Sequence, residues 1–132
     1  MPFNANWITG TSLSVDAVKE AENLGKELAP ENQRDFNAMT STQLRKFFGE
    51  LKKIQLEAKV QTDNEFKPLK VKLLKPKLAY AKGRATSRDN RIGIFYKEVA
   101  VAIDAIQTRQ HLLNFVDWIE AVVAYHKFYG GN

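Results

Sequence analysis

The chain has 132 residues, of which 44% are hydrophobic and 11% aromatic, and its formal net charge is +5. A chain of this length and composition can bury a genuine core, which argues against disorder, and the absence of cysteine excludes disulfides and thiolate metal sites. The first residues form neither a basic start nor an apolar run, and no stretch of about 18 apolar residues occurs, so we expect no secretory signal, no membrane-spanning helix and a soluble, cytoplasmic protein.

The first predicted helix lies near the start of the chain. The opening 13 residues read as a loose tail, from which Trp7 and Ile8 can dock on the rest of the protein. Ser14 is a suitable N-cap for a helix over residues 15–28, in which apolar residues recur at helical spacing until Pro30 ends it. The segment that follows is ambiguous and has room for one short turn of helix.

A second helix is predicted over residues 42–60. Thr40 is followed three residues later by Gln43, which is the pattern of a capping box. Large apolar residues then return every three or four positions, as on one face of a helix. Gly49 stands in the middle of this helix, where glycine costs about 1 kcal/mol relative to alanine. Either close approach of a ligand backbone or of another helix offsets that cost, or the glycine is incidental on a solvated face.

The third helix is expected to be capped by Asp63 or Asn64 and to end near Gly83. Leucines at helical spacing define its buried face. Pro76 should kink it, because proline lacks a backbone N–H and clashes with the preceding turn.

Two more helices complete the predicted fold. One covers roughly residues 91–107, and the other follows Thr108 as its cap and ends at the glycines 130–131. The last helix is apolar over more than half its circumference and should be central. The chain therefore reads as an all-α, compact bundle of about five helices. We predict an N-terminal extension over residues 1–39, packed on or next to a helical domain over residues 40–132.

Catalytic chemistry finds little support in these residues. The two histidines, His111 and His126, are too far apart for a metal pair on one helical face, and no nucleophile or phosphate-loop motif is present. We therefore expect no catalytic residue, no metal and no cofactor. His126 is interpreted as a histidine at the edge of the core whose ring is satisfied by hydrogen bonds.

Positive charge is concentrated in one segment instead. Residues 67–91 hold nine Lys or Arg and a single acid, whereas residues 1–65 have a net charge of −2 and residues 92–132 a net charge of −1. Within the segment no acid stands at i±3 or i±4 of the helix lysines, so their charges would repel one another in isolation. A polyanion relieves this repulsion and releases counterions, so nucleic-acid contact is favoured over a solvated face. Tyr80 has two readings, stacking on a base or packing in the bundle, and packing is preferred.

Three stretches of the sequence resemble the signature blocks of one family. They are "TSTQLRKFFGELKKIQ", "LLKPKLAYAKGR" and "NFVDWIEAVVAYHKFYGG", which follow one another between residues 40 and 131. The family is the small subunit of the type III-A CRISPR–Cas effector, the Csm complex. The resemblance implies a helical, non-catalytic subunit that is present in several copies. These copies stand beside a filament of backbone subunits and line the groove where target RNA pairs with guide RNA.

The resemblance also assigns roles to residues and partners. Sequence-independent RNA contact is carried over onto matched basic positions, which are Arg45, Lys46, Lys52, Lys53, Lys75, Lys77 and Arg84. Four further positions rest on charge and proximity only, namely Lys70, Lys82, Arg88 and Arg91. The third block should build the core and the contact between copies, through Phe115, Trp118, Ile119, Tyr125 and His126. The implied partners are CRISPR RNA, target RNA, the backbone and large subunits, and other copies of the chain, with no membrane.

A second reading comes from another class of protein. In it the chain is a self-associating helical interaction protein, and its basic patch binds an acidic protein partner. This alternative predicts an obligate oligomer with little affinity for RNA.

Overall fold

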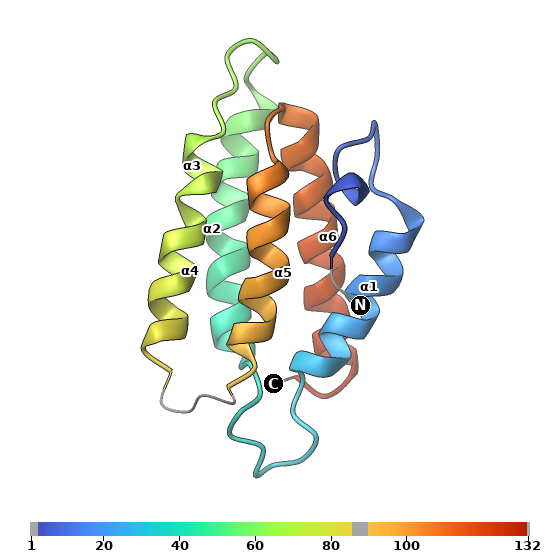
Figure 1. Cartoon of the computed structure of the whole chain (residues 1–132), viewed down its shortest axis with the longest axis vertical. Coiled ribbons are helices and arrows are strands. Elements are labelled where there is room, and N and C mark those ends of the chain that lie inside the picture. The colour runs from blue at the N-terminus through green and yellow to red at the C-terminus, as the bar shows by residue number, and fades with distance from the viewer. Residues whose placement is uncertain (1–2, 86–89, 132) are drawn as a thin grey trace.

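The computed structural model describes residues 3–85 and 90–131. Over this part of the chain the protein forms helices and no β-strand. The elements are η1 (Ala5–Trp7, a 3-10 turn), α1 (Val15–Leu28), α2 (Ser41–Lys59), α3 (Leu69–Lys72), α4 (Leu74–Gly83), α5 (Ile92–Ala105) and α6 (Arg109–Phe128). Successive helices run in alternating directions, with α3 and α4 together as one leg of the bundle (Figure 1). The predicted all-α bundle is confirmed.

Side-chain caps fix the starts of three helices, as the sequence predicts. The Ser14 hydroxyl accepts a hydrogen bond of 3.2 Å from the second backbone N–H of α1. Thr40 and Gln43 form the expected capping box, with backbone N–H groups donating to side-chain oxygens at 2.9 and 3.1 Å. At the start of α6 the Thr108 hydroxyl accepts from the His111 N–H at 3.1 Å, and the His111 ring accepts in return at 3.3 Å. These bonds satisfy N–H groups that a helix start otherwise leaves unpaired.

The predicted start of the third helix is wrong. Thr62 and Glu65 bond to each other's backbone N–H groups at 2.7 and 3.2 Å and form a turn of their own, so neither Asp63 nor Asn64 caps the helix. The first helical residue is Leu69, and no side chain caps it. The helix therefore begins at the first of the spaced leucines, and Thr62 and Glu65 cap a separate turn before it.

The same leg of the bundle is divided into α3 and α4. The division falls at Leu73, one turn before Pro76. Proline has no N–H to donate to the carbonyl four residues earlier, so the helical hydrogen-bond pattern is weakest at this point. The bend at Pro76 stays a prediction.

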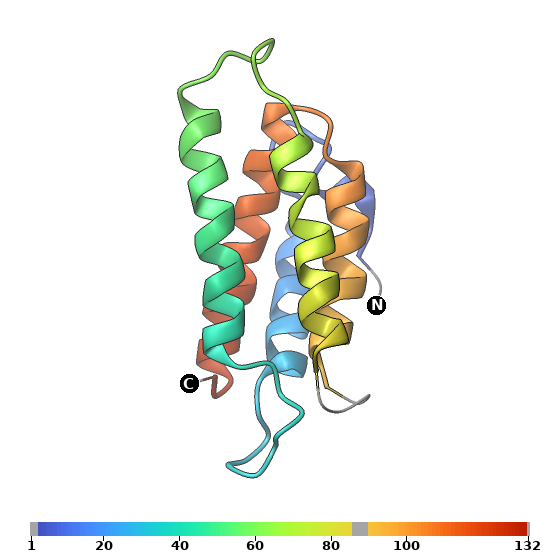
Figure 2. The same cartoon turned by 90° about the vertical axis from the view of Figure 1, so that its left-hand side faces the viewer.

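The last helix, α6, is central to the bundle, as its apolar circumference predicts. It packs against α1, α2 and α5, and Figure 2 shows α6 behind α2 and α4. Phe115, Trp118 and Ile119 have no exposed surface. Their predicted core role is confirmed, but these three side chains cannot form the expected contact between copies in this conformation. Within the described residues, no helix is both long enough and apolar enough to cross a bilayer.

The N-terminal segment enters the core. Ile8 is fully buried, and the Phe3 ring centroid lies 4.5 Å from that of Trp118. The Asn114 side-chain amide donates hydrogen bonds of 2.9 Å to the backbone carbonyls of Ile8 and Gly10, and so ties this segment to α6. The predicted docking of Trp7 and Ile8 is confirmed, whereas the interpretation of the opening residues as a loose tail was wrong, because Phe3 is buried in the core as well. The domain boundary after residue 39 stays a prediction, although side chains from both sides of it share one buried cluster.

Helix α1 approaches α6 very closely at Gly25. A Cβ atom added there would lie 2.7 Å from the Tyr125 Cβ and 2.8 Å from the His126 backbone nitrogen. Beside this contact the buried His126 donates from Nε2 to the Met39 carbonyl at 2.7 Å. Burial lowers the pKa of His126, so the ring is neutral at physiological pH. The predicted satisfied histidine at the core is confirmed.

A pair of buried glutamates joins α1 to α5. Glu20 is 3% exposed and Glu98 is 8% exposed. Burial raises the pKa of Glu98 to about 9, and the neighbouring Glu20 carboxyl adds to the rise. Glu98 is therefore protonated at neutral pH, chiefly because burial disfavours the charged form of its carboxyl group.

Candidate nucleic-acid interface

An open groove of about 770 Å³ lies between α2 and α4. The two helices stand side by side on one flank of the bundle (Figure 2). The floor of this α2–α4 groove is apolar and its rim carries three cations. The floor includes Met39, Phe47, Leu74, Leu78, Ala81 and Ile92, and the rim includes Gln43, Lys46, Glu50, Leu73, Lys77, Tyr80 and Arg84.

The sequence of α4 places floor and rim on adjacent stripes of one helix. Leu74 and Leu78 are four residues apart, and both are buried. Lys77, Tyr80 and Arg84 follow a neighbouring stripe, at spacings of three and four residues, and all three are exposed. Residues at these spacings share one face of a helix. The helix thus buries leucines while it presents an aromatic ring between two cations.

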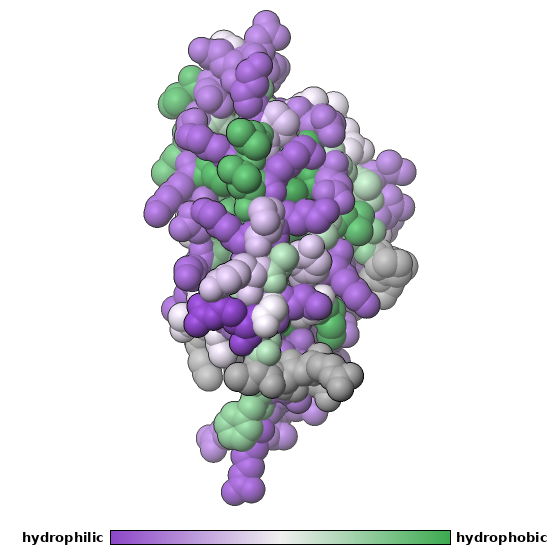
Figure 3. Space-filling model, turned by 60° about the vertical axis from the view of Figure 1, so that its left-hand side comes forward, coloured by the Kyte–Doolittle hydropathy of each residue, from purple (hydrophilic) through white to green (hydrophobic). Residues whose placement is uncertain are grey.

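Three of the seven predicted RNA-binding residues meet at this groove. They are Lys46 from α2, Lys77 from α4 and Arg84 at the end of α4. Glu50 is the only acid among the lining residues. Among the residues that the structure describes, Lys46, Lys77 and Arg84 form no ion pair. The surface view shows hydrophobic surface between hydrophilic side chains on this flank (Figure 3).

The other predicted positions on α2 do not line the groove. Arg45 borders a small hollow beside Val123 and His126, and thus faces α6. The Lys52 ammonium lies 5.7 Å from the Phe48 ring centroid. Lys53 is exposed on α2 but is not among the groove residues. Basic side chains of α2 therefore divide between the groove and the α6 side.

Lys75 lies on the opposite side of α4 from the groove. Its ammonium donates to both carboxylate oxygens of Asp104 on α5, at 2.8 and 3.0 Å. This hydrogen bond raises the pKa of Lys75. The carboxylate partner neutralises a charge that the sequence analysis counted as available to a polyanion.

Other bases of the segment also find partners across the bundle. Lys70 pairs with Glu57 of α2 at 2.6 Å. Lys72 donates to the Ile103 and Asp104 carbonyls at the end of α5, at 3.2 and 3.3 Å. The expectation that the segment's charges lack acidic partners was therefore too strong, because it considered neighbours on one helix only.

Arg91 serves the fold. Its guanidinium bonds to the Asp35 carboxylate and donates to the Ala29 carbonyl at 3.1 Å, which joins α5 to the loop after α1. The Arg91 hydrogen bond keeps the pKa of Asp35 below its usual value. Arg88 lies outside the described residues. The stem of Lys82 packs near Gly93, where an added Cβ would lie 3.1 Å from the Lys82 Cε.

Tyr80 is the groove residue that sequence reasoning assigned to the wrong environment. It is 69% exposed and does not pack in the bundle. The Arg84 guanidinium carbon lies 5.7 Å from its ring centroid. The spacing of Lys77, Tyr80 and Arg84 was visible in the sequence, because all three fall on one stripe beside the buried Leu74 and Leu78.

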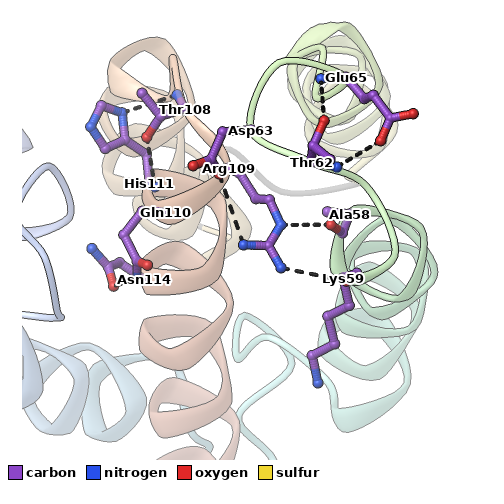
Figure 4. Close-up of polar contacts among 10 residues, drawn as sticks. All are labelled: Ala58, Lys59, Thr62, Asp63, Glu65, Thr108, Arg109, Gln110, His111 and Asn114. Atoms are coloured by element: carbon purple, nitrogen blue, oxygen red, sulfur yellow. Dashed lines mark hydrogen bonds and ion pairs between the residues drawn. The ribbon is translucent and has the colours of Figure 1, made fainter.

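Polar contacts at the far end of α2 have a structural role. Arg109 donates from Nε to the Ala58 carbonyl at 2.7 Å and from a terminal nitrogen to the Lys59 carbonyl at 3.4 Å (Figure 4). A cation at the C-terminal carbonyls of a helix is favourable, so Arg109 fastens the end of α2 to the start of α6. Among the described residues, no three His, Asp or Glu side chains are arranged to hold a metal ion.

Fold and groove together define a small all-α protein with a basic, partly apolar groove on one flank. A family model described as Csm2, Type III-A, matches residues 14–132. The chain therefore belongs to the Csm2 family, the small structural subunit of the type III-A Csm complex. This match confirms the resemblance seen in the sequence and also takes in α1, which the resemblance did not cover. The comparison with curated proteins gave no match.

Proposed function

We propose that this chain is a non-catalytic RNA-binding assembly subunit of its effector complex. In this proposal several copies line the path of the guide RNA–target RNA duplex, and each holds the RNA backbone through sequence-independent contacts. The partners are CRISPR RNA, target RNA, the backbone and large subunits and further copies of the chain, in the cytoplasm and without a cofactor. The observation that carries the proposal is the convergence of Lys46, Lys77 and Arg84 on the α2–α4 groove.

The chemistry of the rim suits such a role. Lysine and arginine contact phosphates without reading bases, while base pairing with the guide RNA supplies the sequence information. Each phosphate that a cation neutralises releases counterions, so binding should weaken steeply as salt rises. The cations stand on two helices of one bundle, which holds them in place. Contacts by Arg45, Lys52, Lys53 and Lys75 remain part of the proposal, with less support from the geometry of the groove.

The test is a salt series with the purified chain and a labelled single-stranded RNA of unrelated sequence. Fluorescence anisotropy would compare the wild type with the Lys46→Ala/Lys77→Ala double variant. We expect the double variant to bind more weakly and to lower the slope of log K against log salt by about 1.4, or about 0.7 for each lost contact.

Lys75→Ala is the matched control, because Asp104 already holds its ammonium. It should change the salt slope less than Lys77→Ala, which removes the same charge from the same helix. Equal affinity and slope in the wild type and the double variant would refute the proposed groove contact.

A second candidate function has an observation of its own. Large apolar side chains are exposed at the end of α2 and on α3, with Leu56 63%, Val60 84% and Leu69 64% exposed. Such surfaces are typical of contacts with protein. They favour the alternative of a self-associating interaction protein whose basic patch meets an acidic partner. Sedimentation of the isolated chain, together with RNA binding at low salt, separates the two candidate functions. The interaction protein requires a stable oligomer with little affinity for RNA.

A further inference from the structure

The α2–α4 groove contains more than phosphate binding requires. Contact with an RNA backbone would require only that Lys46, Lys77 and Arg84 project from a flat polar surface. Here they surround an apolar floor in an open groove of about 770 Å³. Leu73, above this floor, is 49% exposed. Exposing apolar surface to water costs free energy, so the groove points to an occupant with an apolar face.

Tyr80 adds a flat aromatic surface to the same groove. The chain has four tyrosines. Tyr80 is exposed, whereas Tyr96, Tyr125 and Tyr129 are partly buried. Its ring lies between Lys77 and Arg84 along one stripe of α4, with the Arg84 guanidinium 5.7 Å from the ring centroid. An aromatic ring flanked by cations is the arrangement on which single-stranded nucleic acids stack their bases.

We propose that the α2–α4 groove binds an unpaired nucleotide of single-stranded RNA, with the base stacked on Tyr80 and the flanking phosphates held by Lys77 and Arg84. This inference rests on the proposed RNA-binding function and names the form of RNA that the site takes. A nucleotide matches both parts of the groove, because its base offers an apolar face and its phosphates offer negative charge. Lys46 faces this position from α2, and Glu50 is the one acid at the groove.

Paired RNA fits the groove less well. In a duplex the bases are stacked on each other, and the deep, narrow major groove keeps side chains from reaching them. A duplex can therefore contact the cations but not the Tyr80 ring or the floor. An apolar peptide would fit the floor but would leave the cations of the rim without partners, so charge complementarity favours the nucleotide.

The experiment uses a short single-stranded RNA that carries one 2-aminopurine, whose fluorescence falls when it stacks. The full chain, Tyr80→Ala, Tyr80→Phe and Lys77→Ala would be titrated across a salt series, with the matching duplex as a second ligand. Circular dichroism would check the fold of each variant, which the exposure of Tyr80 and Lys77 leads us to expect intact. Sedimentation of each variant would report the state of association.

We expect Tyr80→Ala to weaken single-strand binding about 5- to 150-fold, the range for loss of one stacked base. Its salt slope should stay unchanged, because no cation is lost, and the 2-aminopurine quenching should disappear. Tyr80→Phe should keep both affinity and quenching. Lys77→Ala should lower the salt slope by about 0.7 and keep the quenching at saturation. Tyr80→Ala should leave duplex binding unchanged.

Each contrary outcome has a separate meaning. If the chain binds RNA with a steep salt slope but Tyr80→Ala changes neither affinity nor quenching, the stacking inference is overturned and the proposed function stands. If the wild type binds no RNA at low salt, both fail. If Tyr80→Ala instead dissolves an oligomer of the wild type, the groove is a contact between copies and the inference is overturned.

Discussion

Helix pairs α1–α6 and α2–α4 differ in how closely they pack. At Gly25 the backbone of α6 comes so near that an added Cβ would lie 2.7 Å from the Tyr125 Cβ. Between α2 and α4 the bundle instead leaves an open groove of about 770 Å³. Gly49 of α2 has no other atom within 4 Å of an added Cβ. We infer that stability resides mainly in the α1–α6 half, which allows the α2–α4 half to expose its cations and an aromatic ring.

Deleting a large aromatic side chain from each half should give the largest difference in the free energy of unfolding. Trp118 has no exposed surface and contacts the rings of Phe3 and Phe115. Trp118→Ala should lower the free energy of unfolding by about 3–5 kcal/mol, because it removes buried area and leaves a cavity. Tyr80→Ala, the matched control on the groove side, should change it by less than about 1 kcal/mol. Urea titrations of both variants test this, and similar losses would show that the two halves do not differ in this way.

Close packing at Gly25 gives the next effect. Gly25→Ala should destabilise the chain by about 1–3 kcal/mol, the usual cost of forcing a methyl group into a packed contact. Helix propensity alone would predict a gain, since alanine is the better helix former. Thermal or urea unfolding therefore distinguishes the two causes by sign. A more stable variant would mean that α1 and α6 move apart at little cost.

The buried glutamate pair makes the α1–α5 contact sensitive to pH. The pKa of Glu98 is about 9 in the folded chain, whereas an unfolded glutamate has a pKa of about 4.3. The folded state thus holds a proton that the unfolded state has released. Its stabilising effect is fully present below the unfolded pKa and is lost as pH rises through the folded pKa, at no more than about 1.4 kcal/mol per pH unit.

Glu98→Gln tests this dependence, because glutamine keeps the shape of the side chain without a titrating proton. Stability measured by urea titration between pH 5 and roughly pH 9 should fall with pH in the wild type and less steeply in the variant. Parallel curves for the two proteins would exclude Glu98 as the titrating group.

Gly49→Ala should have the smallest effect on stability, and the effect should be opposite in sign to that of Gly25→Ala. The added methyl group meets open space, so the isolated chain should gain at most about 1 kcal/mol from helix propensity. The same urea assay measures this gain. If the variant also binds RNA or other copies more weakly, a ligand backbone approaches α2 at Gly49. Unchanged binding would mean that the glycine is incidental.

Local sequence patterns predicted local features well. The Ser14 cap, the Thr40–Gln43 capping box and the central position of α6 all depend on residues near one another in the chain. The late start at Leu69 was missed because two local patterns competed, a helix cap at Asp63 or Asn64 and the Thr62–Glu65 pair, and only the folded chain shows which one prevails.

The surroundings of the predicted site residues were foreseen only in part, for a related reason. Charge density pointed to residues 67–91, and two predicted RNA-binding residues of this segment, Lys77 and Arg84, lie with Lys46 of α2 at the groove. It gave no warning that Asp104 and Glu57 would cross from other helices to pair with Lys75 and Lys70. Sequence reasoning also placed Tyr80 inside the bundle. Side-chain type alone does not say whether a ring at the edge of a leucine stripe is covered by other residues.

The contacts that tie the start of the chain to α6 have a consequence for folding during synthesis. Asn114 binds the carbonyl of Ile8, and Tyr129 donates to the Glu22 carboxylate at 2.6 Å, so each bond spans more than a hundred residues. These contacts have a high contact order, and closing such loops is slow. These bonds can form only after α6 and Tyr129 have been synthesised. Until then the apolar faces of η1 and α1 stay uncovered, so the nascent chain relies on late closure by its last helix.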